Sequence, residues 1–166
     1  SPETYLESVT CRFSVDLKGI HRFIANKREE REEFNSGKTE VAVVHIVVGA
    51  MVHAFRKEPI LRQRRVRIPW LLIDRVVDAS NEPLVISVSE STGDFVTLSG
   101  IEKRKVQDLA DDLTKARDDT KTKSHPAGEC IVVAVSNSED PEMTIDALPS
   151  GRSVSILAIV GGIHQE

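Results

Sequence analysis

Residues 86–98 read Ile-Ser-Val-Ser-Glu-Ser-Thr-Gly-Asp-Phe-Val-Thr-Leu, and they contain a clear secondary-structure pattern. Apolar and polar side chains alternate before and after its Ser-Thr-Gly centre, a pattern typical of strands that turn one face to a core. Glycine adopts a positive φ at no steric cost, so residues 91–93 have the chemistry of a hairpin turn. The stretch therefore predicts two strands, Leu84–Glu90 and Asp94–Ser99, joined as a β-hairpin.

Three segments around this hairpin have the periodicity of helices. Residues 20–34 set a few apolar side chains among many charges, which predicts a solvated helix that ends near Asn-Ser-Gly at 35–37. Between Thr39 and Phe55, valines recur at spacings of three, four and seven, which predicts a buried helix ended by Pro59. The third segment, Val106–Ala116, has apolar residues at helical spacing and charges between them.

Five further segments are predicted to be strands. Val9–Val15 alternates with period two, and the short runs Gln63–Arg67 and Trp70–Val77 are also interpreted as strands. Cys130–Val135 and Val154–Val160 are rich in β-branched residues and bounded by turn residues, which predicts strands buried on both faces.

Composition and length bound the class of protein. The chain has 166 residues, 40% apolar and 29% charged, and a formal net charge of -4, so we expect residues 1–166 to form a single α/β domain. Cys11 and Cys130 lie far apart without neighbouring metal ligands, which argues against a zinc site and favours a reducing compartment. The first residues lack the apolar core of a signal peptide, and we expect no membrane span because no apolar run reaches about 18 residues.

The five histidines are the candidate general bases of the chain. His45 and His53 lie eight residues apart in the predicted buried helix, hence on similar faces, but no carboxylate lies between them, which favours packing over function. His21 and His125 have polar neighbours and are interpreted as solvated. His164 follows two glycines that resemble a strand terminus and not a phosphate-binding loop.

The densest run of positive charge lies between residues 56 and 67. It consists of Arg56, Lys57, Arg62, Arg64, Arg65 and Arg67. Such a run neutralises phosphates, which makes nucleic-acid binding an alternative function. The chain as a whole is acidic and has no nucleic-acid-binding motif, so a solvated or subunit-contacting face is favoured.

Ser136 and Asn137 follow an apolar strand directly. A hydroxyl beside an amide at a strand end can stabilise an oxyanion, although the same dipeptide is common in turns, and by spacing alone the turn is favoured.

The order of these elements resembles the C-terminal core domain of the dihydrolipoamide acyltransferases of 2-oxo acid dehydrogenase complexes, relatives of chloramphenicol acetyltransferase. The resemblance covers most of the chain and rests on five stretches. They are residues 13–17 (Phe-Ser-Val-Asp-Leu), the long apolar helix within Glu40–Arg62, the hairpin at 86–98, residues 132–137 (Val-Val-Ala-Val-Ser-Asn) and residues 156–163 (Ile-Leu-Ala-Ile-Val-Gly-Gly-Ile).

The resemblance implies a chloramphenicol acetyltransferase-like mixed sheet with flanking helices, C-terminally truncated. It places Ser136 where the family keeps an oxyanion-stabilising serine, with Asn137 beside it. The family's catalytic histidine belongs to an Asp-His-Arg-x-x-Asp-Gly motif beyond the strand that ends here at Gly161, and this chain does not contain that motif. Ser-Glu-Asp-Pro at 138–141 also replaces the family's glycines. A lone oxyanion donor gives at most a residual rate.

We therefore expect a non-catalytic structural component of a 2-oxo acid dehydrogenase complex, with pyruvate dehydrogenase the expected type. The resemblance implies a homotrimer that assembles with the acyltransferase core, and a link to dihydrolipoamide dehydrogenase through parts outside this chain. Subunit contacts are expected at Arg62, Arg64, Arg65 and Arg67 or in the linker 136–153. We expect no cofactor or metal in this chain, and a location in the mitochondrial matrix of a eukaryote or the cytoplasm of a bacterium.

The alternative is a fragment of an active dihydrolipoamide acyltransferase. In that case the histidine-bearing segment lies outside this chain, and coenzyme A and lipoyl-lysine are the substrates.

Overall fold

The computed structural model describes Cys11 and residues 14–34, 37–90, 95–119, 128–134 and 156–161. Within these residues the chain is a mixed α/β protein with three α-helices and two sheets, which confirms the predicted class. The helices are α1 (Lys18–Glu33), α2 (Val43–Lys57) and α3 (Val106–Asp118), with short 3₁₀ turns η1 (Pro59–Arg62) and η2 (Pro69–Leu71). The strands are β1 (Gln63–Ile68), β2 (Ile73–Asp78), β3 (Val85–Ser89), β4 (Val96–Ser99), β5 (Cys130–Ala134) and β6 (Ile156–Val160).

The larger sheet has the strand order β4-β3-β5-β6. β3 and β4 pair antiparallel from Val85 opposite Ser99 to Val88 opposite Val96, which confirms the hairpin predicted from residues 86–98; its turn lies outside the described residues. β5 runs parallel to both β3 and β6. The chain crosses from β4 to the far side of β3 through α3, as parallel pairing requires.

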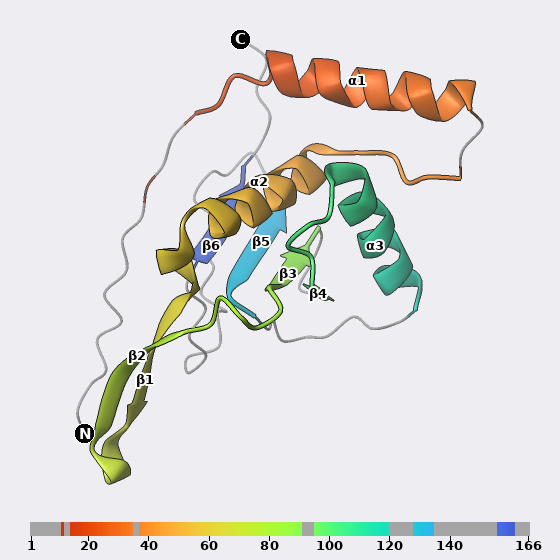
Figure 1. Ribbon diagram of the computed structural model, residues 1–166. Coiled ribbons are helices and arrows are strands. Elements are labelled where there is room, and N and C mark those ends of the chain that lie inside the picture. The colour runs from red at the N-terminus through yellow and green to blue at the C-terminus, as the bar shows by residue number, and fades with distance from the viewer. Residues whose placement is uncertain are drawn as a thin grey trace.

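Helices α2 and α3 cover the sheet and contain the other half of the core (Figure 1). The core side chains share near-complete burial. They include Val44, Val48, Val52 and Phe55 of α2, Leu109 and Leu113 of α3, and Ile86, Val88, Cys130 and Val132 of the strands. Both predicted helices are thus confirmed, and α2 ends two residues before Pro59, which starts η1. None of the described helices is long and apolar enough to cross a membrane.

Helix α1 lies outside this core and buries none of its residues, as the charge pattern predicted. An ion pair between Arg28 and Glu40 connects it to the segment before α2. The strand predicted at Val9–Val15 falls mainly outside the described residues. Cys11 and residues 14–17 are described and are not in a strand, and Asp16 instead accepts a hydrogen bond from the Lys18 amide at the start of α1.

Strands β1 and β2 form a separate two-stranded antiparallel hairpin that projects from the body of the molecule (Figure 1). The strand predicted over Trp70–Val77 begins only at Ile73. Pro69 has no amide hydrogen for a strand ladder, and residues 69–71 form η2 instead. Leu72 closes the turn in the left-handed conformation, with φ 53°.

The prediction that the last two strands are buried on both faces holds for one of them. Cys130, Ile131 and Val132 of β5 are fully buried between neighbouring strands and helices. β6 is an edge strand of the described sheet, and its Ile159 is 48% exposed. For β6, the apolar β-branched run therefore predicted the strand correctly but did not predict how far it is buried.

Candidate functional site

The predicted oxyanion residues, Ser136 and Asn137, are not among the residues that the structure describes. β5 ends at Ala134, and His125, His164 and the linker 136–153 likewise lie outside the described residues. The structure therefore leaves the oxyanion interpretation as a prediction. Among the residues it does describe, three groups of polar or exposed side chains are candidates for a functional site.

The first group surrounds His45. This imidazole is buried at the start of α2, and its Nδ1 accepts a hydrogen bond from the Ala42 amide at 2.9 Å, so the ring proton lies on Nε2. Nε2 lies 3.5 Å from a carboxylate oxygen of Glu90, which Arg117 of α3 also contacts. His45 therefore caps α2 and joins it to the end of β3.

Glu90 is stabilised as an anion by these neighbours. The hydrogen bond with His45, and then the charge of Arg117, hold the pKa of Glu90 below its ordinary value despite partial burial. His53, expected on a similar face to His45, is exposed. Eight residues at about 100° each leave the two side chains about 80° apart, enough to place one inside and one outside. The two histidines do not form a common site.

The second group is the basic run, which the fold divides. Arg64 pairs with Glu82, and Arg65 pairs with Asp74 across the β1–β2 hairpin, while Arg67 is exposed. Arg62, by contrast, is 5% exposed. Its burial removes Arg62 from the predicted contact surface, whereas the other three arginines remain at the surface of the hairpin.

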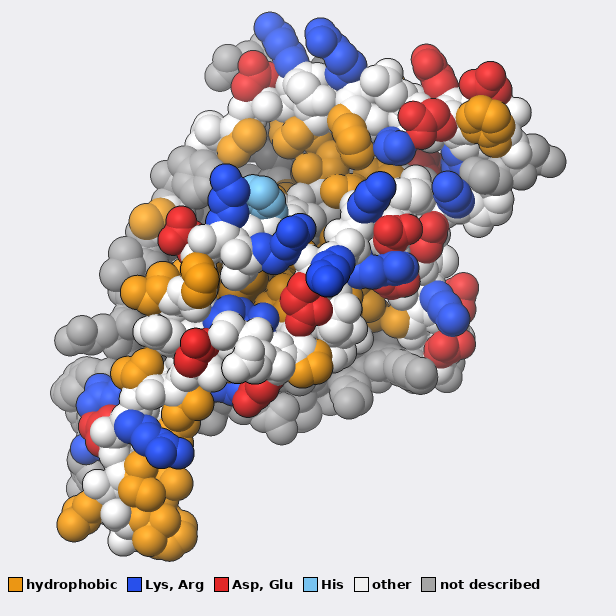
Figure 2. Space-filling view, viewed as in Figure 1, with side chains coloured by type: hydrophobic (Ala, Val, Ile, Leu, Met, Phe, Trp, Pro, Cys, Tyr) orange, Lys and Arg blue, Asp and Glu red, His pale blue; other side chains and the backbone are white. Residues whose placement is uncertain are grey.

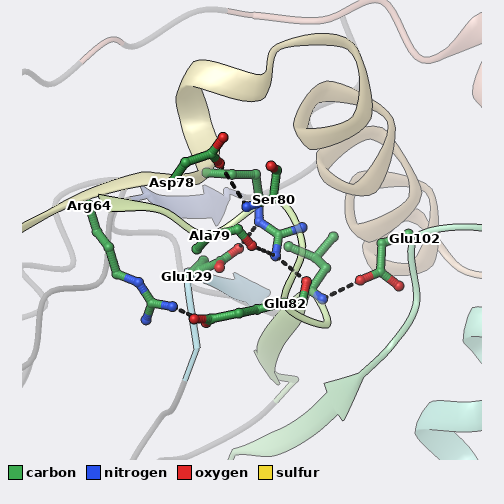
Figure 3. Close-up of polar contacts among 9 residues, drawn as sticks. Arg64, Asp78, Ala79, Ser80, Glu82, Glu102 and Glu129 are labelled. Atoms are coloured by element: carbon green, nitrogen blue, oxygen red, sulfur yellow. Dashed lines mark hydrogen bonds and ion pairs between the residues drawn. The ribbon is translucent and has the colours of Figure 1, made fainter. Parts of the chain in front are cut away.

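Arg62 is the centre of a buried junction at the base of the hairpin. Its guanidinium donates to the carbonyl oxygens of Ala79 at 2.7 Å and Glu82 at 2.6 Å, and its Nε lies 2.8 Å from Oε2 of Glu129. Its own carbonyl accepts from the Ala79 amide at 2.9 Å. Figure 3 shows Ala79, Glu82 and Glu129 grouped at this junction. One side chain thus joins the end of β2, the turn after it and the residue before β5.

Burial sets the electrostatics of this junction. Desolvation raises the pKa of Glu129, and the nearby Arg62 only partly offsets this effect. The Nε–Oε2 contact is close but poorly aligned, so it is an ion pair and not a well-formed hydrogen bond. Sequence reasoning missed the junction because Arg62 and Glu129 lie far apart in the chain. The one local signal was an arginine directly after the apolar pair Ile60-Leu61.

The third group is the end of the hairpin itself. Trp70, Leu71 and Leu72, here called the apolar tip, are all exposed, with Trp70 at 81% and Leu72 at 94%. Figure 2 shows hydrophobic side chains gathered at the end of the projecting hairpin. Solvent-facing apolar clusters of this kind mark interaction sites in folded proteins.

Neither a protein-family model nor a curated protein matches this chain. Within the described ranges, no three histidine, cysteine or acidic side chains gather closely enough to hold a metal ion. Cys130 is buried in the core, which raises the pKa of its thiol to about 12, so it is a packing residue and not a nucleophile. The apolar tip and its buried base are the candidate functional site.

Proposed function

We propose that this chain is a non-catalytic structural component of a 2-oxo acid dehydrogenase complex core. The functional model is protein X, the dihydrolipoamide dehydrogenase-binding component of the pyruvate dehydrogenase complex. On this proposal the domain has the chloramphenicol acetyltransferase-like fold suggested by its sequence and assembles with the dihydrolipoamide acyltransferase.

One observation carries the assembly function: a hairpin that projects from the body has a firmly held base and an exposed apolar tip. Arg62 anchors the base through two carbonyl oxygens and Glu129. Trp70 and Leu72 expose their side chains at the other end. An anchored arm loses little conformational entropy on binding, which favours a role in holding subunits together. The choice of complex rests on the sequence resemblance.

Co-expression with a dihydrolipoamide acyltransferase core tests the proposal. We expect the full-length chain, carrying an affinity tag, to co-purify with the acyltransferase in a particle of core size by native mass spectrometry. The matched control is the same chain with Trp70→Ser and Leu72→Ser, which we expect to co-purify much more weakly. Separate elution of the wild-type chain and the acyltransferase would contradict the proposed function.

The alternative, a fragment of an active acyltransferase, has one observation in its favour. β5 lies between two parallel neighbours and ends just before Ser136. Ligands of open α/β sheets bind at the carboxyl ends of their strands, and Ser136 follows such an end. The test is to read the coding sequence past Glu166. A His-x-x-x-Asp-Gly motif there supports the enzyme, and a stop codon directly after Glu166 contradicts it.

A further inference from the structure

We propose that a cavity between the end of α1 and the start of α3 binds a small phosphate ester. The phosphate lies against basic side chains of the cavity, and the organic part of the ligand lies against Phe34. This binding site goes beyond the structural function proposed above and does not depend on the choice of complex. It follows from the size of the cavity, the charges that line it, the ion pairs that these charges lack and the way its walls are held.

The cavity has the size of a small-molecule site. Its volume is about 520 Å³, and small-molecule sites typically measure about 300–1,000 Å³. The last turns of α1, the segment that follows α1 and the first turn of α3 form its walls, and Figure 1 shows the two helices on the same side of the body. A ligand in the cavity therefore contacts three parts of the chain that lie apart in the sequence.

Positive charge predominates in the lining, although the chain as a whole carries a formal net charge of -4. The charged lining residues are the basic Lys27, Arg31, Lys38 and Lys105 and the acidic Glu30 and Asp108. Four basic and two acidic side chains leave a net of two positive charges. Like charges repel, so this arrangement is unfavourable unless an anion lies among them. A phosphate ester is close to a dianion at neutral pH and matches the net charge.

The two carboxylates of the cavity already have partners of their own. Glu30 pairs with Lys27 at 2.8 Å along α1, so these two charges offset each other. Asp108 accepts a hydrogen bond from the backbone amide of Lys105 at 3.3 Å, and it also interacts electrostatically with Arg104. An anion that enters the cavity therefore displaces neither carboxylate from its contacts.

Arg31, Lys38 and Lys105 supply the positive charge that remains. Among the residues that the structure describes, no carboxylate forms an ion pair with any of these three side chains. A guanidinium binds two phosphate oxygens at once, and an ammonium group binds phosphate as a point charge. One guanidinium and two ammonium groups together fit a phosphate better than they fit a single carboxylate.

Two of the three walls are held in place without a ligand. Gln107 of α3 donates to the carbonyl oxygen of Thr39 at 2.8 Å, and Asp111 of α3 accepts from the Thr39 amide at 2.7 Å. These bonds hold the segment that carries Lys38 against α3. The third wall, α1, buries none of its residues and is joined to this segment by an exposed ion pair, which contributes little. A ligand that contacts all three walls therefore holds α1 more firmly to the body.

Phe34 adds an aromatic side chain to the lining. Its backbone amide donates to the Glu30 carbonyl at the end of α1, while its side chain is 73% exposed. A single exposed aromatic residue is ordinary, but this one borders the same cavity as the three unpaired basic side chains. An aromatic ring packs well against another flat ring. The lining therefore favours a phosphate ester of an aromatic group over inorganic phosphate.

Isothermal titration calorimetry of the full-length chain with phenyl phosphate tests the proposal. We expect one molecule to bind per chain, more weakly as salt is added. Arg31→Gln and Lys38→Gln should each raise the dissociation constant about tenfold, because each removes a charged contact with the phosphate. Lys57→Gln removes the same charge at the exposed end of α2 and should leave binding unchanged.

Phe34→Ala separates the two halves of the site. It should weaken the binding of phenyl phosphate severalfold and leave the weaker binding of inorganic phosphate unchanged, because inorganic phosphate has no ring to pack against Phe34. The substituted side chains are exposed or half-buried, so we expect all variants to keep the denaturation midpoint of the wild type. An unchanged midpoint shows that a loss of binding is not a loss of folding.

Three results would overturn the proposal. The first is a wild type that binds no phenyl phosphate, and the second is binding that Arg31→Gln and Lys38→Gln both leave unchanged. The third is binding confined to phosphatidic acid vesicles, which would assign the basic side chains to a lipid headgroup. None of these substitutions lies in the β1–β2 hairpin, so they should not alter co-purification with the acyltransferase. Failure of the cavity and failure of the proposed function are therefore distinguishable.

Discussion

The four-stranded sheet and the β1–β2 hairpin are both built from short strands, but they are stabilised in different ways. β3 is buried along nearly its whole length between α2, α3 and its neighbouring strands. β1 alternates between exposed and half-buried residues along its length, and the hairpin is joined to the body at Arg62. Apolar burial that stabilises the fold is therefore concentrated in the sheet and its helices, whereas the apolar residues of the hairpin remain at the surface.

The largest effect is expected where the two regions join. Arg62→Ala leaves Glu129 buried without its cation and two carbonyl oxygens without their donor, so we expect a loss of about 3–5 kcal/mol in the free energy of unfolding. Urea denaturation measures it. The double variant Arg62→Met with Glu129→Leu removes both charges and should recover most of the loss. An equal loss in the double variant would contradict the ion-pair explanation.

A leucine replaced by alanine should have different effects in the two regions. Leu109 of α3 is fully buried, so Leu109→Ala removes transfer energy and opens a cavity, with an expected loss of about 2–5 kcal/mol. Leu72 at the apolar tip is exposed, so Leu72→Ala should change the free energy of unfolding by about 0.5 kcal/mol or less. Both are measured by urea denaturation of the monomer at low concentration. Similar losses would mean that the tip packs within its own chain.

Alanine substitutions at two glycines distinguish the cost of a left-handed backbone from the cost of a steric clash. A Cβ at Gly128, which has φ 99°, would collide with the Val85 carbonyl that accepts the Glu129 amide, whereas a Cβ at Gly100, with φ 70°, meets nothing within 4 Å. Gly100→Ala should cost about 1–2 kcal/mol from its left-handed backbone alone. Gly128→Ala should cost more, because β5 must also move from β3. Thermal denaturation compares them, and equal losses would show that the sheet accommodates the methyl group.

Most of the sheet and its covering helices could be predicted because their signals are local. Alternation around residues 91–93 indicated β3 and β4, and the spacing of valines indicated α2. These patterns repeat every two or three to four residues, so a short window of sequence contains them. Burial of β6 could not be read in this way, because it depends on whether a further strand lies beside it.

The candidate site was much less predictable. The basic run was identified, but its division into a buried Arg62 and exposed arginines depends on Glu129, a residue 67 positions away in the chain. That the hairpin projects from the body likewise depends on long-range packing, which a short window of sequence does not contain. The left-handed backbone at Leu72 has no sequence signal either, because that conformation favours glycine. Pro69 was the one local sign that the strand over Trp70–Val77 begins late.

The smallest expected effect is on the pH dependence of the free energy of unfolding, to which the carboxylates of Glu90 and Glu129 contribute with opposite sign. The pKa of Glu90 is lowered mainly by His45, so its contribution is present above the ordinary glutamate pKa of about 4.3 and is lost as the pH falls through the depressed value in the folded protein. Glu129 has the opposite sign. Burial raises its pKa, so stability declines as the pH rises from the ordinary glutamate value through the raised one.

Urea denaturation between about pH 3 and pH 7 separates the two contributions, because each window lies on a different side of the ordinary glutamate pKa. Glu90→Gln should remove a few tenths to about 1 kcal/mol at neutral pH and little at the acidic end. Glu129→Gln should flatten the decline above the ordinary value, and Glu30→Gln, at an exposed ion pair with Lys27 on α1, should change neither window appreciably. A Glu90→Gln loss that persists unchanged at the acidic end would mean that packing around His45, and not its contact with the carboxylate, holds the start of α2 to β3.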